Sequence, residues 1–85
     1  MTEATDVATA AADLTVDTSG TCCPIPVVEA RKAVARLEIG QTMELIATDP
    51  GSRVDMVAWT ANTGHELLAS QADGGTYRFL IRRKR

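Results

Sequence analysis

The sequence predicts a two-layer α/β (α+β) sandwich in which two helices cover one face of a mixed four-stranded sheet. Three observations predict it. Two stretches with helical periodicity follow short strand-like segments, two further strand-like segments close the chain around a glycine-rich turn, and 85 residues suffice for one small core. The expected element order is β-α-β-α-β-β, in a single domain over residues 13–85.

The first half of the domain should form a strand, a loop and a helix. Residues 1–12 are rich in Ala and Thr without an apolar face, so we expect a disordered lead-in there. Leu14–Asp17 alternates as a strand does, and Gly20 gives the next loop its backbone freedom. A helix should run from about Pro24 to Leu37 and bury a stripe made of Val27, Ala30, Val34 and Leu37.

A second strand and a second helix should follow. The strand is expected at Thr42–Ala47. Asp49 suits the helix cap, Pro50 suits the first helical position, and Gly64 suits the residue that ends the helix. The inner stripe of this helix is expected to comprise Val54, Val57, Ala58 and Ala61.

A hairpin should close the chain. Its strands are expected at 65–71 and 76–82, with Asp73-Gly74 in the turn. In the last strand, Tyr77, Phe79 and Ile81 should face one way, while the residues between them face the other. The antiparallel hairpin, added to a β-α-β unit, predicts a mixed sheet.

A cysteine stands where the first helix should begin, in the tetrapeptide Cys23-Pro24-Ile25-Pro26. Prolines are tolerated in a first turn, because the N–H groups that they lack would have no partner there. The partial positive charge of a helix N-terminus favours thiolate over thiol. Since the second thiol of a C-x-x-C pair is absent, the motif predicts chemistry on Cys23 alone. The alternative is a small buried cysteine with no reactivity.

Two further residues, Cys22 and His65, are weaker candidates for a functional role. We expect Cys22 to be an incidental loop residue, and the alternatives are a second sulfur site or a strained vicinal disulfide with Cys23. We expect His65, the only histidine, to be structural. Adjacent cysteines lack the spacing of a structural zinc site, so we expect neither a metal nor a cofactor.

Several residues together form a known pattern: Asp17, Gly20, Cys23-Pro24-x-Pro26, Asp49-Pro50, Asp55, Gly64-His65 and the closing segment 77–81. From Leu14 to Arg82 the chain resembles the TusA/SirA-like sulfur-carrier family. The resemblance implies the fold derived above and a sulfurtransferase that acts as a carrier. It implies a persulfide on Cys23, with Gly20 and the prolines of the motif, Pro24 and Pro26, in support.

The same resemblance implies protein partners on both sides of the transfer. The donor would be a cysteine desulfurase or a rhodanese-like protein, and the acceptor would belong to tRNA thiolation, sulfur oxidation or a cofactor pathway. One departure precedes the motif, because Cys22 stands where the family often has a basic or other non-thiol residue. Arg31 or Arg53 would then have to support the thiolate through space.

Charge and hydropathy exclude other classes. The net charge of −2 gives no global nucleic-acid footprint, no segment is long enough to span a membrane, and the N-terminus does not resemble a secretory signal. We expect a cytoplasmic monomer with reduced thiols that does not bind nucleic acid directly. The basic residues 82–85 are expected to form a solvated tail. The alternative is a regulatory or RNA-interacting module of the same fold.

Overall fold

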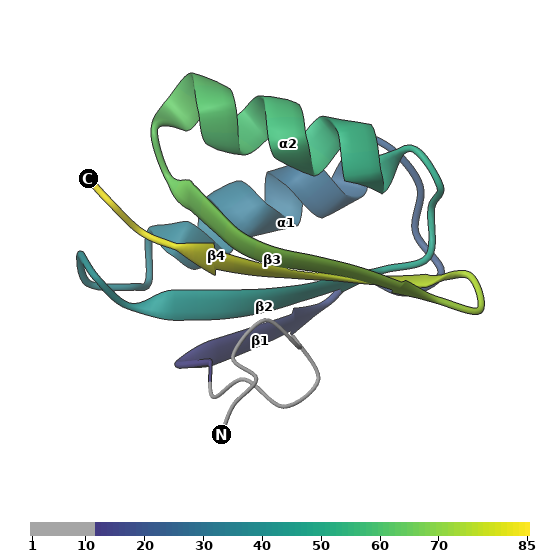
Figure 1. The fold of residues 1–85 in the computed structure, drawn as a ribbon, viewed down its shortest axis with the longest axis horizontal. Helices are drawn as coiled ribbons and strands as arrows, with labels where there is room; N and C mark the ends of the chain where they lie inside the picture. Colours follow the sequence, from purple (N-terminus) through teal and green to yellow (C-terminus); the bar gives the residue numbers. More distant parts are fainter. Residues whose placement is uncertain (1–11) are drawn as a thin grey trace.

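The computed structural model describes residues 12–85, which form the predicted β-α-β-α-β-β sandwich (Figure 1). All but one residue of the expected lead-in at 1–12 lies outside the described residues. The elements are β1 (Leu14–Asp17), α1 (Ile25–Val34), β2 (Thr42–Ala47), α2 (Ser52–Thr63), β3 (Glu66–Asp73) and β4 (Thr76–Arg82).

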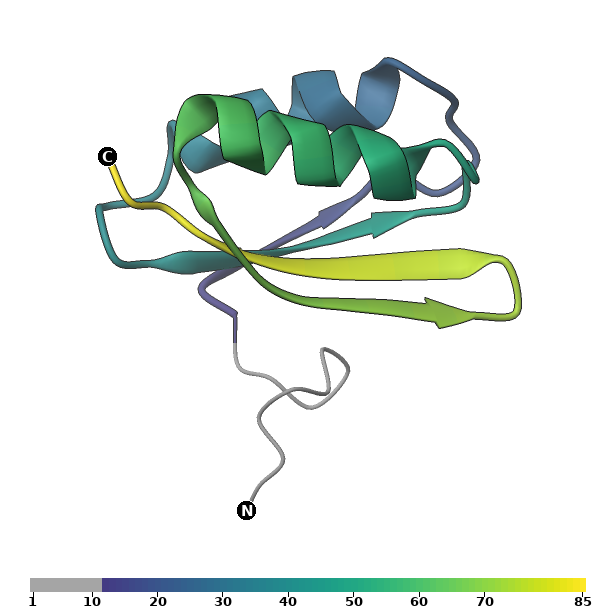
Figure 2. The same ribbon diagram turned by 45° about the horizontal axis from the view of Figure 1, so that its top comes forward.

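The sheet is mixed and has the strand order β1-β2-β4-β3. β1 and β2 are parallel, whereas β4 is antiparallel to both of its neighbours. Both helices cover the same face of the sheet (Figures 1 and 2). The predicted fold class is therefore confirmed. Because β1 and β2 are parallel, they end at the same edge of the sheet, and both helices begin at that end of the molecule (Figure 2).

The core lies between the helices and the sheet. Alternate residues of β2, Met43, Leu45 and Ala47, are completely buried, and so are Phe79 and Ile81 of β4. This alternation follows from the two-residue period of a strand, which sends every second side chain to the same face. The prediction that Phe79 and Ile81 share a face is confirmed.

α1 is shorter than predicted at both ends. Pro24 precedes the helix instead of occupying its first position, while Pro26 lies in the first turn. After Val34 the backbone tightens, because Leu37 N–H donates to the Val34 carbonyl, three residues back, and this ends the helix. Leu37 is buried from the turn that follows, and the helix itself buries Pro26, Ala30, Ala33 and Val34.

α2 packs against the sheet with a different face from the predicted one. Its buried residues are Ser52, Met56, Trp59 and Thr60. The residues predicted to be inside are all exposed, with 73% of Val54 and 55% of Val57 accessible to solvent. We call these four residues the outer stripe of α2: Val54, Val57, Ala58 and Ala61.

The two buried hydroxyls of α2 explain how polar residues occupy its inner face. Ser52 Oγ donates to the Asp49 carbonyl at 2.7 Å. Thr60 Oγ1 donates to the Met56 carbonyl at 2.9 Å. Short hydroxyl side chains can satisfy themselves on nearby backbone in this way, so their burial leaves no polar group without a partner.

The start of α2 also differs from the prediction, whereas its end agrees. Gly51 precedes the helix and no side chain caps it, so Asp49 and Pro50 lie outside. The Ser52 N–H instead donates to the Asp49 backbone carbonyl at 3.0 Å, which places a turn before the helix. Gly64 ends the helix with φ 82°, in the left-handed conformation that glycine adopts readily.

The hairpin turn is displaced by one residue from the expected Asp-Gly position. Asp73 pairs with Thr76, so the turn consists of Gly74 and Gly75, both with positive φ. A two-residue turn with two positive φ angles matches the twist of the flanking strands. β3 begins one residue later and ends two residues later than predicted.

Candidate functional site

Cys23 lies in the loop between β1 and α1, at the end of the molecule where both helices begin (Figure 2). Hydrogen bonds tie this loop to the end of β2. The Thr18 N–H donates to the Ile46 carbonyl at 2.7 Å, and the Gly20 N–H donates to Thr48 Oγ1 at 2.9 Å. The loop that presents the thiol is therefore anchored to the sheet.

Gly20 has a conformational role in this loop. Its φ of 82° lies in the left-handed region, which L side chains rarely adopt. A Cβ added there would have no atom within 4 Å, so backbone conformation and not crowding calls for glycine.

A shallow groove of about 300 Å³ lies between the start of α1 and one side of α2. The wall from the β1–α1 loop and α1 consists of Cys23, Pro24 and Val27. The wall from α2 has the i, i+3, i+4, i+7 spacing of one helix face and consists of Asp55, Ala58, Trp59 and Asn62. Cys23 and Asp55 thus lie in one groove, although 32 positions separate them in the sequence.

A second hollow, of about 590 Å³, lies on the other side of α2. It is lined by Pro50, Arg53, Val54, Val57, Ala58 and Ser70. Ala58 borders both hollows, so an apolar surface extends from the groove at Cys23 across the outer stripe of α2.

The surroundings of Cys23 act on its ionisation in the direction opposite to the one expected from the helix start. A hydrogen bond to the Asp55 carboxylate, followed by loss of hydration and the negative charges of Asp55 and Asp49, raises the pKa of the Cys23 thiol. The Ile25 N–H, at the first residue of α1, donates to the Cys22 carbonyl at 2.9 Å. The carboxylates of Asp55 and Asp49 therefore oppose the thiolate that the helix start was expected to favour.

Asp55 is the site residue that sequence reasoning missed. In the sequence it stood out only as one residue of the family pattern, and in the structure it lies in the first turn of α2. Two helices that start at one sheet edge bring their first turns together, and this was the available signal.

Neither arginine proposed as support for the thiolate is among the groups that shift the pKa of Cys23. Arg31 lies in the last turn of α1, at the opposite end of the helix from Cys23. Arg53 lines the second hollow, and its guanidinium carbon lies 5.9 Å from the centre of the Tyr77 ring. Cys22 is a free, exposed thiol, as is Cys23.

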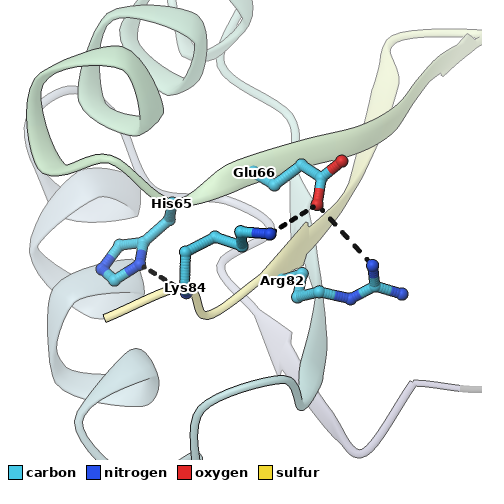
Figure 3. Close-up of polar contacts among 4 residues, drawn as sticks. All are labelled: His65, Glu66, Arg82 and Lys84. Atoms are coloured by element: carbon cyan, nitrogen blue, oxygen red, sulfur yellow. Dashed lines mark hydrogen bonds and ion pairs between the residues drawn. The ribbon is translucent and has the colours of Figure 1, made fainter.

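His65 lies beyond the other end of α2, away from Asp55. Its ring lies 5.5 Å from that of Trp59, and its Nδ1 accepts a hydrogen bond from the Lys84 N–H at 3.2 Å (Figure 3). Burial, and then the charges of Arg83 and Arg85, lower the pKa of His65. His65 therefore has the contacts of a structural residue, because its ring packs beside Trp59 and accepts a backbone hydrogen bond.

The basic C-terminal residues contact the domain and do not form the expected solvated tail. Glu66 pairs with Arg82 at 3.6 Å and with Lys84 at 3.8 Å (Figure 3). The Arg83 backbone N–H donates to the Gln41 carbonyl, and its guanidinium donates to the Leu37 carbonyl. These contacts partly neutralise the charge that an RNA-binding function would need.

Two further findings concern the part of the chain that the structure describes. Over residues 12–85, no helix has the length and apolar character needed to cross a membrane. The same residues contain no group of three or more His, Cys, Asp or Glu side chains that could hold a metal ion.

The fold and the site define a class of protein: a small α/β domain that presents one exposed thiol in a groove beside its first helix. The family model of the sulfurtransferase TusA matches residues 14–83. This chain belongs to the TusA family.

Individual relatives agree with this assignment. The sulfur carrier protein TusA of Allochromatium vinosum is 42% identical over 71 residues, which are 84% of this chain and 93% of that protein. The sulfur carrier protein TusA of Pseudomonas entomophila is 43% identical over 72 residues, covering 85% and 90% of the two chains. The crystal structure of a SirA-like protein from Desulfitobacterium hafniense superposes with a TM-score of 0.70 at 29% identity, covering 85% of this chain and 99% of that one.

Proposed function

We propose that this protein is a sulfur carrier, which accepts a sulfane sulfur as a persulfide on Cys23 and delivers it to an acceptor protein. The observation that best supports this function is the exposure of the Cys23 thiol in an open groove. An enzyme acting on a small molecule usually encloses its substrate, whereas a protein relay needs a sulfur that other proteins can reach. Membership of the TusA family supports the same function.

The relay requires two successive nucleophilic displacements, one when Cys23 takes up the sulfur and one when it delivers the sulfur. The Cys23 thiolate attacks the outer sulfur of a donor persulfide, a new S–S bond forms, and the donor cysteine leaves as a thiolate. Cys23 then holds the persulfide until an acceptor thiolate or an activated substrate takes its outer sulfur. In this sense the protein is a sulfurtransferase that acts as a carrier and not as a high-turnover enzyme.

The residues that support Cys23 act by shaping the backbone around it. Gly20 provides the left-handed turn in the anchored loop, and Pro24 and Pro26 shape the approach to α1. We place the protein in the cytoplasm as a monomer, where thiols stay reduced. Its donor would be a cysteine desulfurase or a rhodanese-like protein.

Intact-mass spectrometry after incubation with a rhodanese and thiosulfate tests this function. The wild type and Cys22→Ser should each gain the mass of one sulfur atom, which dithiothreitol removes, and Cys23→Ser should gain none. Cys22→Ser is the matched control, since it removes the adjacent exposed thiol. Equal loading of the wild type and Cys23→Ser would refute the assignment of Cys23.

A further inference from the structure

We propose that Asp55 is a positioning residue for Cys23: its carboxylate holds the thiol proton in the free protein and favours partners that bring a positive charge to the groove. The proposal rests on the sulfur-carrier function given above. It adds a control on when the carrier reacts and a chemical requirement on the surface of its donor or acceptor.

The first support is the geometry of the groove. Cys23 precedes α1 and Asp55 lies in the first turn of α2, and both line the same groove. The parallel pairing of β1 and β2 brings these two helix starts to one end of the molecule (Figures 1 and 2). The Asp55 carboxylate thus faces the same hollow as the Cys23 thiol and is the neighbour with the largest effect on the pKa of that thiol.

The second support is the charge around the sulfur. The groups that act on Cys23 from the neighbouring segments are Asp55 on α2, Asp49 on the loop before α2, and Cys22 on its own loop, and each of them disfavours the thiolate. The four ion pairs formed among residues 12–85 use Glu29, Glu44 and Glu66, and none uses Asp49 or Asp55. Within the described residues, the negative charge at the sulfur is not neutralised by an ion pair.

A docked partner can reverse this balance. Cys23 must lose its proton to solvent before its sulfur attacks a donor persulfide, and an unneutralised carboxylate opposes this loss. A lysine or arginine of the partner, paired with Asp55, offsets the carboxylate charge and lets the thiol ionise. The exposed Val54 and Val57, which line the second hollow and are joined to the groove through Ala58, offer apolar surface to the same partner. The thiol is then most reactive in the complex, which limits its loss to unrelated electrophiles.

The first test measures alkylation of Cys23 by iodoacetamide as a function of pH, in a Cys22→Ser background. Asp55→Asn should shift the rate profile to lower pH and raise the rate near neutrality several-fold. Asp55→Glu should retain most of the original profile. Asp49→Asn should shift it less in the same direction, because Asp49 acts through charge alone. Asp73→Asn, an exposed acid in the hairpin, is the control and should change nothing.

Superimposable profiles for Asp55→Asn and its background would overturn the proposal. Alkylation needs no sulfur donor, so this result would leave the sulfur-carrier function standing. Asp49 lies outside both helices, and Asp49→Asn therefore provides a second variant if Asp55→Asn folds poorly.

The second test measures charge preference with two small disulfides of opposite charge. Cystamine, a dication, should form a mixed disulfide with Cys23 faster than dithiodiglycolate, a dianion. Asp55→Asn should lower the ratio of the two rates by roughly fivefold through the lost attraction to cystamine, as expected for one charge pair near contact in water, and further through the lost repulsion of dithiodiglycolate. Molar salt should lower the ratio as well, because the Debye length is then only about 3 Å. A ratio that Asp55→Asn leaves unchanged would overturn the proposal.

Discussion

At the scale of the residue, the sulfur of Cys23 illustrates how a neighbour in space can outweigh a neighbour in sequence. The motif Cys23-Pro24-x-Pro26 was recognisable from the sequence, and it predicted both one-cysteine chemistry and the approximate start of α1. The direction in which the pKa of the thiol shifts was not predictable, because it depends on Asp55, a residue of another helix. The nearby carboxylate raises the pKa of the thiol, whereas the Ile25 N–H at the helix start is already bonded to the Cys22 carbonyl.

Gly20 provides a stability prediction at the same scale. Gly20→Ala should lower the free energy of unfolding by roughly 1–2 kcal/mol, because alanine at φ 82° is strained even where space is available. Gly20→Asn should lose less, since asparagine tolerates left-handed backbone better. Urea unfolding followed by circular dichroism measures both variants. An alanine variant as stable as the wild type would contradict the role given to this turn.

At the scale of the element, α2 shows where periodicity stops being informative. The stripe that begins at Val54 and the one that contains Met56 and Trp59 both have helical spacing, and the first is the more apolar. Packing selected the second, because Met56 and Trp59 supply larger side chains to the core and the hydroxyls beside them bond to their own backbone. The strands were predictable within a residue or two, since their two-residue alternation is a local signal. For a helix with two apolar faces, the local sequence does not determine which face is buried, because that depends on packing against the sheet.

The assignment of the two faces leads to a direct comparison of two substitutions in α2. Met56→Ala should lower the free energy of unfolding by about 2–5 kcal/mol, because Met56 is fully buried and its loss leaves a cavity. Val57→Ala should change it by no more than about 0.5 kcal/mol, because Val57 is exposed. Urea unfolding of both variants measures the difference, and the reverse order would contradict the packing of α2.

At the scale of the whole molecule, charge and backbone contacts hold the C-terminal residues against the domain. The fold class, the element order and the mixed sheet followed from local signals in the sequence. The docking of residues 82–85 did not, because it depends on Glu66, Leu37 and Gln41, which come from three separate segments. Arg83 and Arg85 then lie near enough to His65 to lower its pKa, so the C-terminus affects the proton balance of the domain.

The pH dependence of folding should reflect His65. Its folded-state pKa is lowered, so the unfolded chain binds a proton more readily than the folded one. The corresponding stability is present above about pH 6.5, the ordinary value for histidine, and is lost as the pH falls through the lowered folded-state pKa. His65→Gln should flatten this part of the profile. Thermal unfolding between about pH 5 and pH 8 tests it, and identical slopes in both proteins would exclude His65 as the cause.

The anchoring of the loop before α1 has a consequence for how cargo could travel. Carriers that hold their cargo on a flexible arm can serve several stations, because the tether keeps the cargo at a useful local concentration over a wide radius. Here the Thr18 and Gly20 hydrogen bonds fasten the cysteine loop to the end of β2, so the sulfur has little freedom to swing. Transfer of the sulfur would then require the whole domain to dock first on the donor protein and then on the acceptor protein. The complementarity of two rigid surfaces, and not the length of a flexible linker, would then determine which protein receives the sulfur.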